Sequence, residues 1–139
     1  MKASKLLLLA LITILLSFSL SFLFYTTYFI QDIYELDMKM KIGNVVGFDT
    51  NTSVISFGVV PKEGGASQRT VIIKNMENKP LTVRIITKGE MAEWIHIPEK
   101  NFIIAGDEKK EVIFTAIPSK DAKEREYKGK TRFVFSRVI

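Results

Sequence analysis

The side chains that could take part in chemistry are few, and they gather around a single histidine. His96 follows Glu90 and Glu93, so one imidazole and two carboxylates lie close together along the chain. Such groups can hold a metal ion or exchange protons with a substrate, but a closed zinc site needs four ligands and the sequence has no cysteine. We therefore expect no metal site and no thiol chemistry in this segment.

The residues around His96 also fit a short extended segment. Alternate side chains of an extended segment point to opposite faces, so Ile95 and Ile97 share one face while Trp94 and His96 share the other. The isoleucine face is expected to be buried. Two interpretations stay open for Trp94: packing in the core, which we favour, and an exposed aromatic contact.

Three other patterns resemble active-site motifs without completing them. The carboxylates Asp107, Glu108 and Glu111 lack the spacing of a calcium loop. The pair Gly64-Gly65 is not followed by the Gly-Lys-Ser sequence of a phosphate-binding loop, and no serine has the flanking glycines that expose a nucleophile. The sequence therefore predicts no catalytic residue and no cofactor, so an enzyme with an unfamiliar site is the least favoured function.

The N-terminal part of the chain is a long apolar segment. From Leu6 to Ile30 the chain runs for 25 residues without a charge. As a helix this segment would be about 37 Å long, against a hydrocarbon core of about 30 Å. The alternative is a cleaved signal peptide, but Ser17 and Ser19 make a poor cleavage site and aromatic residues continue the apolar run beyond them. We expect residues 1–30 to form an uncleaved anchor that contacts lipid through residues 6–30.

Charges that flank this segment predict its orientation. Lys2 and Lys5 precede it, and positively charged flanks favour the cytoplasmic side, although Lys39 and Lys41 follow closely enough to weaken the bias. We expect a single-pass protein of the cell membrane, with its N-terminus in the cytoplasm and the C-terminal domain outside. The sequon Asn-Thr-Ser that begins at Asn51 makes this residue a candidate glycosylation site.

Residues 31–139 are expected to form one extracytoplasmic domain of paired strands. Apolar and polar residues alternate in short runs, and turn-forming residues separate these runs at intervals near ten residues. Ile33, Tyr34 and Leu36 could instead prolong the helix by a turn or two. The pattern predicts an all-β fold, an immunoglobulin-like β-sandwich of about seven antiparallel strands preceded by one N-terminal transmembrane α-helix. The clearest expected strands are 38–42, 54–57, 69–74, 81–87, 112–116 and 133–138.

The formal net charge of +5 is spread along the chain, which predicts no nucleic-acid partner. A denser basic stretch lies around Tyr127, mixed with acidic residues. It is either a solvated surface or a contact for lipid head groups or an acidic partner. The candidate contact residues are Lys120, Lys123, Arg125, Lys128, Lys130 and Arg132.

Several segments, taken in order, match a known pattern of strands and turns: 55–60, the glycine pair 64–65, 69–75 with its terminal Asn75, and 101–108. In this order they resemble the immunoglobulin-like domains of the major sperm protein and ASPM/SPD-2/Hydin type, and membrane-anchored archaeal surface proteins that carry such domains. Tyr127 and Gly129 match the end of a Gly-x-Tyr-x-Gly motif, whereas Arg125 replaces its first glycine. The resemblance implies an interaction or scaffold domain without catalytic residues, and it leaves the partner open.

These features together predict a non-catalytic, membrane-anchored cell-surface module. It would bind another envelope protein through a sheet edge or through the loops at strand ends. The main alternative is a subunit of a surface machine, such as an archaellum stator or a pilus, in which the helix would pack against other helices. Nothing in the sequence indicates the oligomeric state.

Overall fold

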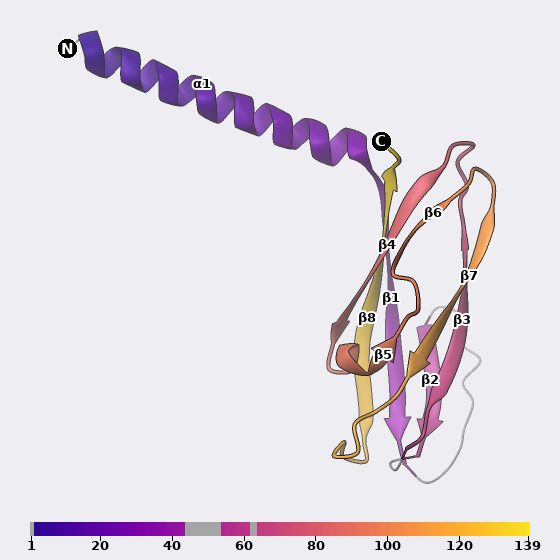
Figure 1. Ribbon diagram of the computed structural model, residues 1–139. Coiled ribbons are helices and arrows are strands. Elements are labelled where there is room, and N and C mark those ends of the chain that lie inside the picture. Colours follow the sequence, from indigo (N-terminus) through magenta and orange to yellow (C-terminus); the bar gives the residue numbers. More distant parts are fainter. Residues whose placement is uncertain (1, 44–53, 62–63) are drawn as a thin grey trace.

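A computed structural model describes residues 2–43, 54–61 and 64–139 of the chain (Figure 1). It begins with helix α1 (Lys2–Phe24), which continues as a π-helical segment, η1 (Tyr25–Phe29). Together they are 28 residues long and apolar enough to cross a membrane. No residue of α1 is buried, so its leucine and phenylalanine side chains face outwards on every side. A helix that is apolar all round suits lipid better than water.

The polar side chains of α1 make their hydrogen bonds within the helix. The hydroxyl of Thr13 donates to the carbonyl of Ala10 at 2.8 Å, and the hydroxyl of Ser17 donates to the carbonyl of Thr13 at 2.9 Å. Ser19 donates in the same way to Leu15, at 2.9 Å. Because each hydroxyl is bonded to the preceding turn, it needs no water, and the helix can face lipid at these positions.

The helix does not continue into the residues that follow the apolar segment. Strand β1 (Ile30–Ile42) starts immediately after η1, so the suggestion that Ile33, Tyr34 and Leu36 prolong the helix is wrong. β1 pairs along nearly its whole length with β8 (Glu126–Arg137). These backbone hydrogen bonds and the packing of the inner face outweigh the helix propensity of the segment. Helix and sheet are therefore joined without a linker.

The remaining described elements are β2 (Val54–Val60), β3 (Ser67–Lys74), β4 (Leu81–Gly89), a 3-10 turn η2 (Ala92–Trp94), β5 (Ile95–His96), β6 (Asn101–Ile104) and β7 (Lys109–Ala116). They form a five-stranded sheet of order β2-β1-β8-β4-β6 and a three-stranded sheet of order β3-β7-β5. The predicted β-sandwich after one N-terminal helix is confirmed.

Two details differ from the expected strands. Eight strands are present among the described residues, where about seven were expected, because the two residues of β5 pair with β7 as a short strand of their own. β1 and β2 run parallel, with Asp37 opposite Val54 and Ile42 opposite Val60, whereas all pairs were expected to be antiparallel. Strand direction depends on the chain path between strands, which the alternation of apolar residues does not encode.

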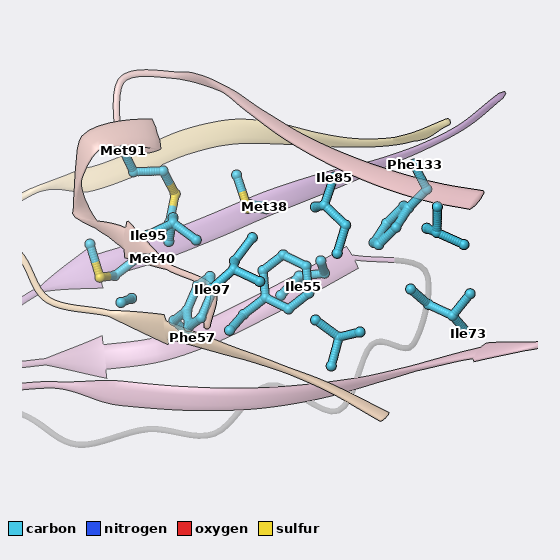
Figure 2. Close-up of a cluster of buried hydrophobic side chains, with 14 of the residues drawn as sticks. Met38, Met40, Ile55, Phe57, Ile73, Ile85, Met91, Ile95, Ile97 and Phe133 are labelled. Carbon is cyan, nitrogen blue, oxygen red and sulfur yellow. The ribbon is translucent and has the colours of Figure 1, made fainter. Parts of the chain in front are cut away.

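The core lies between the two sheets and is built mostly from alternate residues of the strands (Figure 2). Met38 and Met40 of β1 are each 1% exposed, and they alternate with the outward-facing lysines of the same strand. Phe114 of β7 is fully buried, and its ring meets that of Phe133 of β8 edge to face, with 6.2 Å between centroids. Ile95 and Ile97 are buried as expected.

Buried Asn75 joins two turns at the end of the sandwich next to the helix. Its side-chain amide donates to the carbonyls of Lys79 at 2.8 Å and Ala105 at 3.0 Å, and its carbonyl accepts from the backbone N–H of Glu77 at 2.9 Å. The side chain is only 1% exposed, so these bonds replace water. Asn75 therefore holds the turn before β4 against the turn before β7.

Tyr127 fixes the loop that leads into β8 at the opposite end. Its hydroxyl donates to the carbonyl of Lys123 at 3.1 Å and accepts from the backbone N–H of the same residue at 3.0 Å. A tyrosine bonded to the backbone a few residues upstream is a recurrent feature of immunoglobulin-type sandwiches. The ring of Trp94 packs edge to face on Tyr127 at 4.8 Å, and Trp94 lies against the core while staying partly exposed, between the two interpretations of the sequence.

Changing Tyr127 to phenylalanine is expected to lower the free energy of unfolding by about 1 to 2 kcal/mol, because two hydrogen bonds to the loop are lost while the ring stays in place. The measurement is guanidinium unfolding of the full chain in detergent micelles, followed by the fluorescence of Trp94. Tyr34→Phe is the matched control, since Tyr34 is 58% exposed. An equal effect of both substitutions would contradict the proposed role of the Tyr127 hydroxyl.

Candidate interaction site

The pairing of β1 with β8 gives the sandwich a near end and a far end relative to the helix. Ile30, next to the helix, pairs with Ser136, whereas Lys41 pairs with Glu126. Figure 1 shows the C-terminus beside the end of α1 and the start of β8 at the opposite end. At about 3.3 Å per strand residue, Lys128 lies about 30 Å along the sheet from the helix-side end of β8.

A hollow of about 730 Å³ lies toward the far end, and we call it the far hollow. Strands β1, β4 and β8 bring outward-facing side chains to it from three distant parts of the sequence. Its lining combines four lysines and three carboxylates with a few small or apolar residues. The lining residues are Asp37, Met38, Lys39, Val54, Lys88, Gly89, Glu90, Glu126, Lys128, Gly129 and Lys130.

The floor of the far hollow is backbone where β4 and β8 meet. Gly89 pairs with Gly129, and a Cβ on Gly89 would lie only 2.8 Å from the Cα of Gly129. Gly89 also has a positive φ of 99°, which other residues rarely adopt. The glycine pair therefore lets β4 and β8 approach closely at the floor of the hollow, and the charged residues stand around it.

Several of the basic candidate residues are held in ion pairs beside this hollow. Arg132 and Lys130 both bind the carboxylate of Glu35, at 3.0 and 3.1 Å. Arg125 binds Glu90 with both of its terminal nitrogens, at 3.0 and 3.3 Å, and lies 3.9 Å from the ring centre of Tyr127. These pairs place the charges in fixed positions, and they make the surface one of mixed sign.

The ion pairs shift the protonation of two carboxyl groups. Hydrogen bonds from Lys130 and then from Arg132 hold the pKa of Glu35 below its ordinary value. A hydrogen bond from Arg125, supported by the backbone N–H of Lys128, lowers the pKa of Glu90. Both carboxylates therefore stay charged to lower pH than a free glutamate.

Lowered carboxyl pKa values predict a loss of stability in acid. Glu35 stabilises the folded state fully above its ordinary pKa of 4.5, and this contribution disappears as the pH falls through its lowered folded-state value. Glu35→Gln should therefore make the fall in unfolding midpoint below about pH 4 shallower. Thermal unfolding measured across this pH range tests the effect, with exposed Glu124→Gln as the control. Identical pH curves for Glu35→Gln and the original chain would contradict it.

The other sequence-based candidates lie apart from these pairs. Lys120 and Lys123 are exposed in the loop before β8, at the far end but outside the lining of the far hollow. Asn51 lies outside the described residues. Asp37, Lys39 and Lys88 were missed as site residues, because only strand pairing brings β1 and β4 beside β8. The alternation of Lys39 with Met38 and Met40 was the one sequence signal that it faces outwards.

The segment around the single histidine forms no comparable cluster. His96 is exposed on β5, and Glu90 is engaged with Arg125. Within the described parts of the chain, no three histidine, aspartate or glutamate side chains are grouped as metal ligands would be. The far hollow, in contrast, gathers seven charged side chains around an open surface.

The edge between β2 and β3 is closed by side chains. The hydroxyl of Ser67 donates to the carbonyl of Phe57 at 2.8 Å, and the guanidinium of Arg69 donates to the carbonyl of Ser56. These bonds use carbonyls that an added strand would need. This edge is therefore a poor place for strand addition, and the loops and outer face near the far end are better candidates.

No protein-family model matches this sequence, and no curated protein is significantly similar to it.

Proposed function

We propose that this chain is a non-catalytic, membrane-anchored module of the cell surface that binds another envelope protein at the far hollow. The observation that carries the proposal is the position of this hollow, at the end of the sandwich that points away from the apolar helix. A contact surface at this end is open to a partner that approaches from outside the membrane.

The composition of the far hollow supports a protein partner. Charged residues of both signs surround a small floor made of Val54 and of the backbone at Met38 and the two glycines. Small protein contacts have this arrangement, with an apolar centre and a polar rim. A polyanion such as nucleic acid would instead favour a surface of one sign.

The same geometry favours a protein over lipid as the partner of the basic stretch. Lys128 and Lys130 stand about 30 and about 23 Å along the sheet from its helix-side end, well beyond the Debye length of about 8 Å at physiological salt. We therefore assign these residues to a protein contact. The resemblance to immunoglobulin-like interaction domains agrees with this proposal.

The helix and its flanks define the proposed orientation. Residues 2–29 cross the membrane once, the N-terminus lies in the cytoplasm, and the sandwich stands outside. Since the chain has no cysteine, single cysteines at Ala3 and Thr70 report on the two sides. A membrane-impermeant maleimide should label Thr70→Cys on intact cells and leave Ala3→Cys unlabelled, and the reverse pattern would refute the orientation.

Site-specific crosslinking tests the contact itself. A photoreactive amino acid at Lys88 in the far hollow should give one discrete adduct with an extracytoplasmic protein in the native membrane, whereas the same group at Thr70, on the outer face of the other sheet, should give none. Reversing Lys128 and Lys130 to glutamate should abolish the adduct, because it removes the fixed positive charges. Equal adducts from positions 88 and 70 would count against the proposal.

A further inference from the structure

A second hollow lies at the near end, where the helix, the sheet and the C-terminus meet. It has a volume of about 430 Å³, and we call it the near hollow. Tyr25 and Phe29 of η1 line one side, Arg84 of β4 lies on the outer face of the sheet, and Arg137 and Ile139 come from the end of the chain. Three distant parts of the sequence thus enclose one space beside the end of the helix.

The length of the helix sets the level of the near hollow in a membrane. The twenty residues from Leu6 to Tyr25 rise about 30 Å, which equals the thickness of the hydrocarbon core. Tyr25 and Tyr28 then lie at the outer boundary, where tyrosines are enriched. Because β1 follows η1 without a linker, the near hollow lies within the layer of lipid head groups.

The two arginines of the near hollow differ from the basic residues farther along the same sheet. Arg132 and Lys130 are paired with Glu35, whereas no described acidic side chain forms an ion pair with Arg84 or Arg137. The guanidinium of Arg137 lies 4.3 Å from the ring centre of Tyr28 and donates to the side-chain oxygen of Gln31 at 2.6 and 3.0 Å, so both residues hold it beside the helix. Neither of these two positive charges, at the level of the head groups, is compensated by a described acidic side chain.

Apolar residues complete the near hollow on the side of the membrane. The rings of Tyr25 and Phe29 stack at 5.0 Å between centroids. Val138 is 40% exposed and Ile139 is fully exposed, so both offer apolar surface beside these rings. Apolar groups beside unpaired arginines are suited to a molecule that carries a phosphate next to acyl chains.

We infer that the near hollow binds an anionic phospholipid of the outer leaflet, with its phosphate held by Arg84 and Arg137 and its glycerol and upper acyl chains against Tyr25, Phe29 and Ile139. The inference rests on the proposed membrane anchorage. A bound lipid would fix the sandwich upright on the membrane, so that the far hollow points outwards. In this proposal one end of the sheet binds a lipid and the other end binds a protein.

Native mass spectrometry of the full chain, released from detergent micelles with added phosphatidylglycerol, tests this site. Each arginine near a charged lipid surface contributes about fivefold in affinity, so Arg84→Gln with Arg137→Gln should weaken phosphatidylglycerol binding about 25-fold. Phosphatidylcholine should bind weakly to both forms of the chain. The lipid head group alone, added as glycerophosphoglycerol, should not compete, because it lacks the acyl chains.

The matched control is Lys74→Gln with Lys109→Gln. Lys74 and Lys109 lie opposite each other in the other sheet, at the same end of the sandwich but outside the near hollow. Their substitution removes the same amount of positive charge as that of the two arginines. If both double variants weakened binding equally, or if glycerophosphoglycerol competed fully, the site would be refuted. Extraction of membranes with alkaline carbonate tests the anchorage separately. Every variant should resist this extraction, and release of the original chain would refute the anchorage and not the lipid site alone.

Discussion

Replacing Phe114 by alanine is expected to lower the free energy of unfolding of the sandwich by about 4 kcal/mol. Phe114 is fully buried between the sheets, where its ring meets that of Phe133. Removing it leaves a cavity that the strands on both sides cannot close, because their backbones are held in paired ladders. A loss of this size is a large part of the stability of a domain of about 110 residues.

The measurement is guanidinium unfolding of the full chain in detergent micelles, with Trp94 fluorescence as the signal. Ile113→Ala is the matched control, because Ile113 is the preceding residue of β7 and is 46% exposed on its outer face. Its substitution should cost less than about 1 kcal/mol. Similar losses from the two variants would show that the space between the sheets is not the packed core described above.

Replacing Asn75 by alanine is expected to lower the free energy of unfolding by about 3 kcal/mol. The substitution removes the donors that satisfy the carbonyls of Lys79 and Ala105, and the acceptor that satisfies the N–H of Glu77. Unpaired buried polar groups each cost about 1 to 3 kcal/mol. Asn75→Asp should also destabilise the domain, since a carboxylate cannot donate to the two carbonyls.

The same unfolding measurement distinguishes this effect from a general weakness of the turn. Asn78 lies in the same turn and is exposed, so Asn78→Ala should change the stability by less than about 0.5 kcal/mol. If Asn75→Ala were as mild as Asn78→Ala, the hydrogen bonds of Asn75 would not be what joins the two turns. A large loss of stability in Asn75→Ala alone would show that the turn before β4 and the turn before β7 are joined by this one side chain.

The alternation of residue types made the inner faces of the strands predictable. Met38 and Met40 alternate with Lys39 and Lys41, and they lie in the core as this pattern requires. The exception was the start of β1, where a helical continuation stayed open. Local propensity was ambiguous there, and the pairing with β8, more than 90 residues away in the sequence, decided in favour of a strand.

The sequence also identified the basic stretch before and within β8, but it could not identify the surroundings of these residues. Arg132 and Lys130 meet Glu35, and Arg125 meets Glu90, because β1 and β4 flank β8 on its two sides. The two hollows depend on the same pairing. The sequence gives the charge of each residue, but it does not show which residue of opposite charge lies beside it in the fold.

The sequence by itself determined the apolar helix and the all-β character of the remainder, since both follow from local periodicity and from hydrophobicity summed over short windows. Only the tertiary structure decided which strands are neighbours, that β1 and β2 run parallel, and which end of the sheet faces the helix. These properties arise from hydrogen bonds between residues far apart in the chain, and they separate the paired charges of the far hollow from the unpaired arginines of the near hollow.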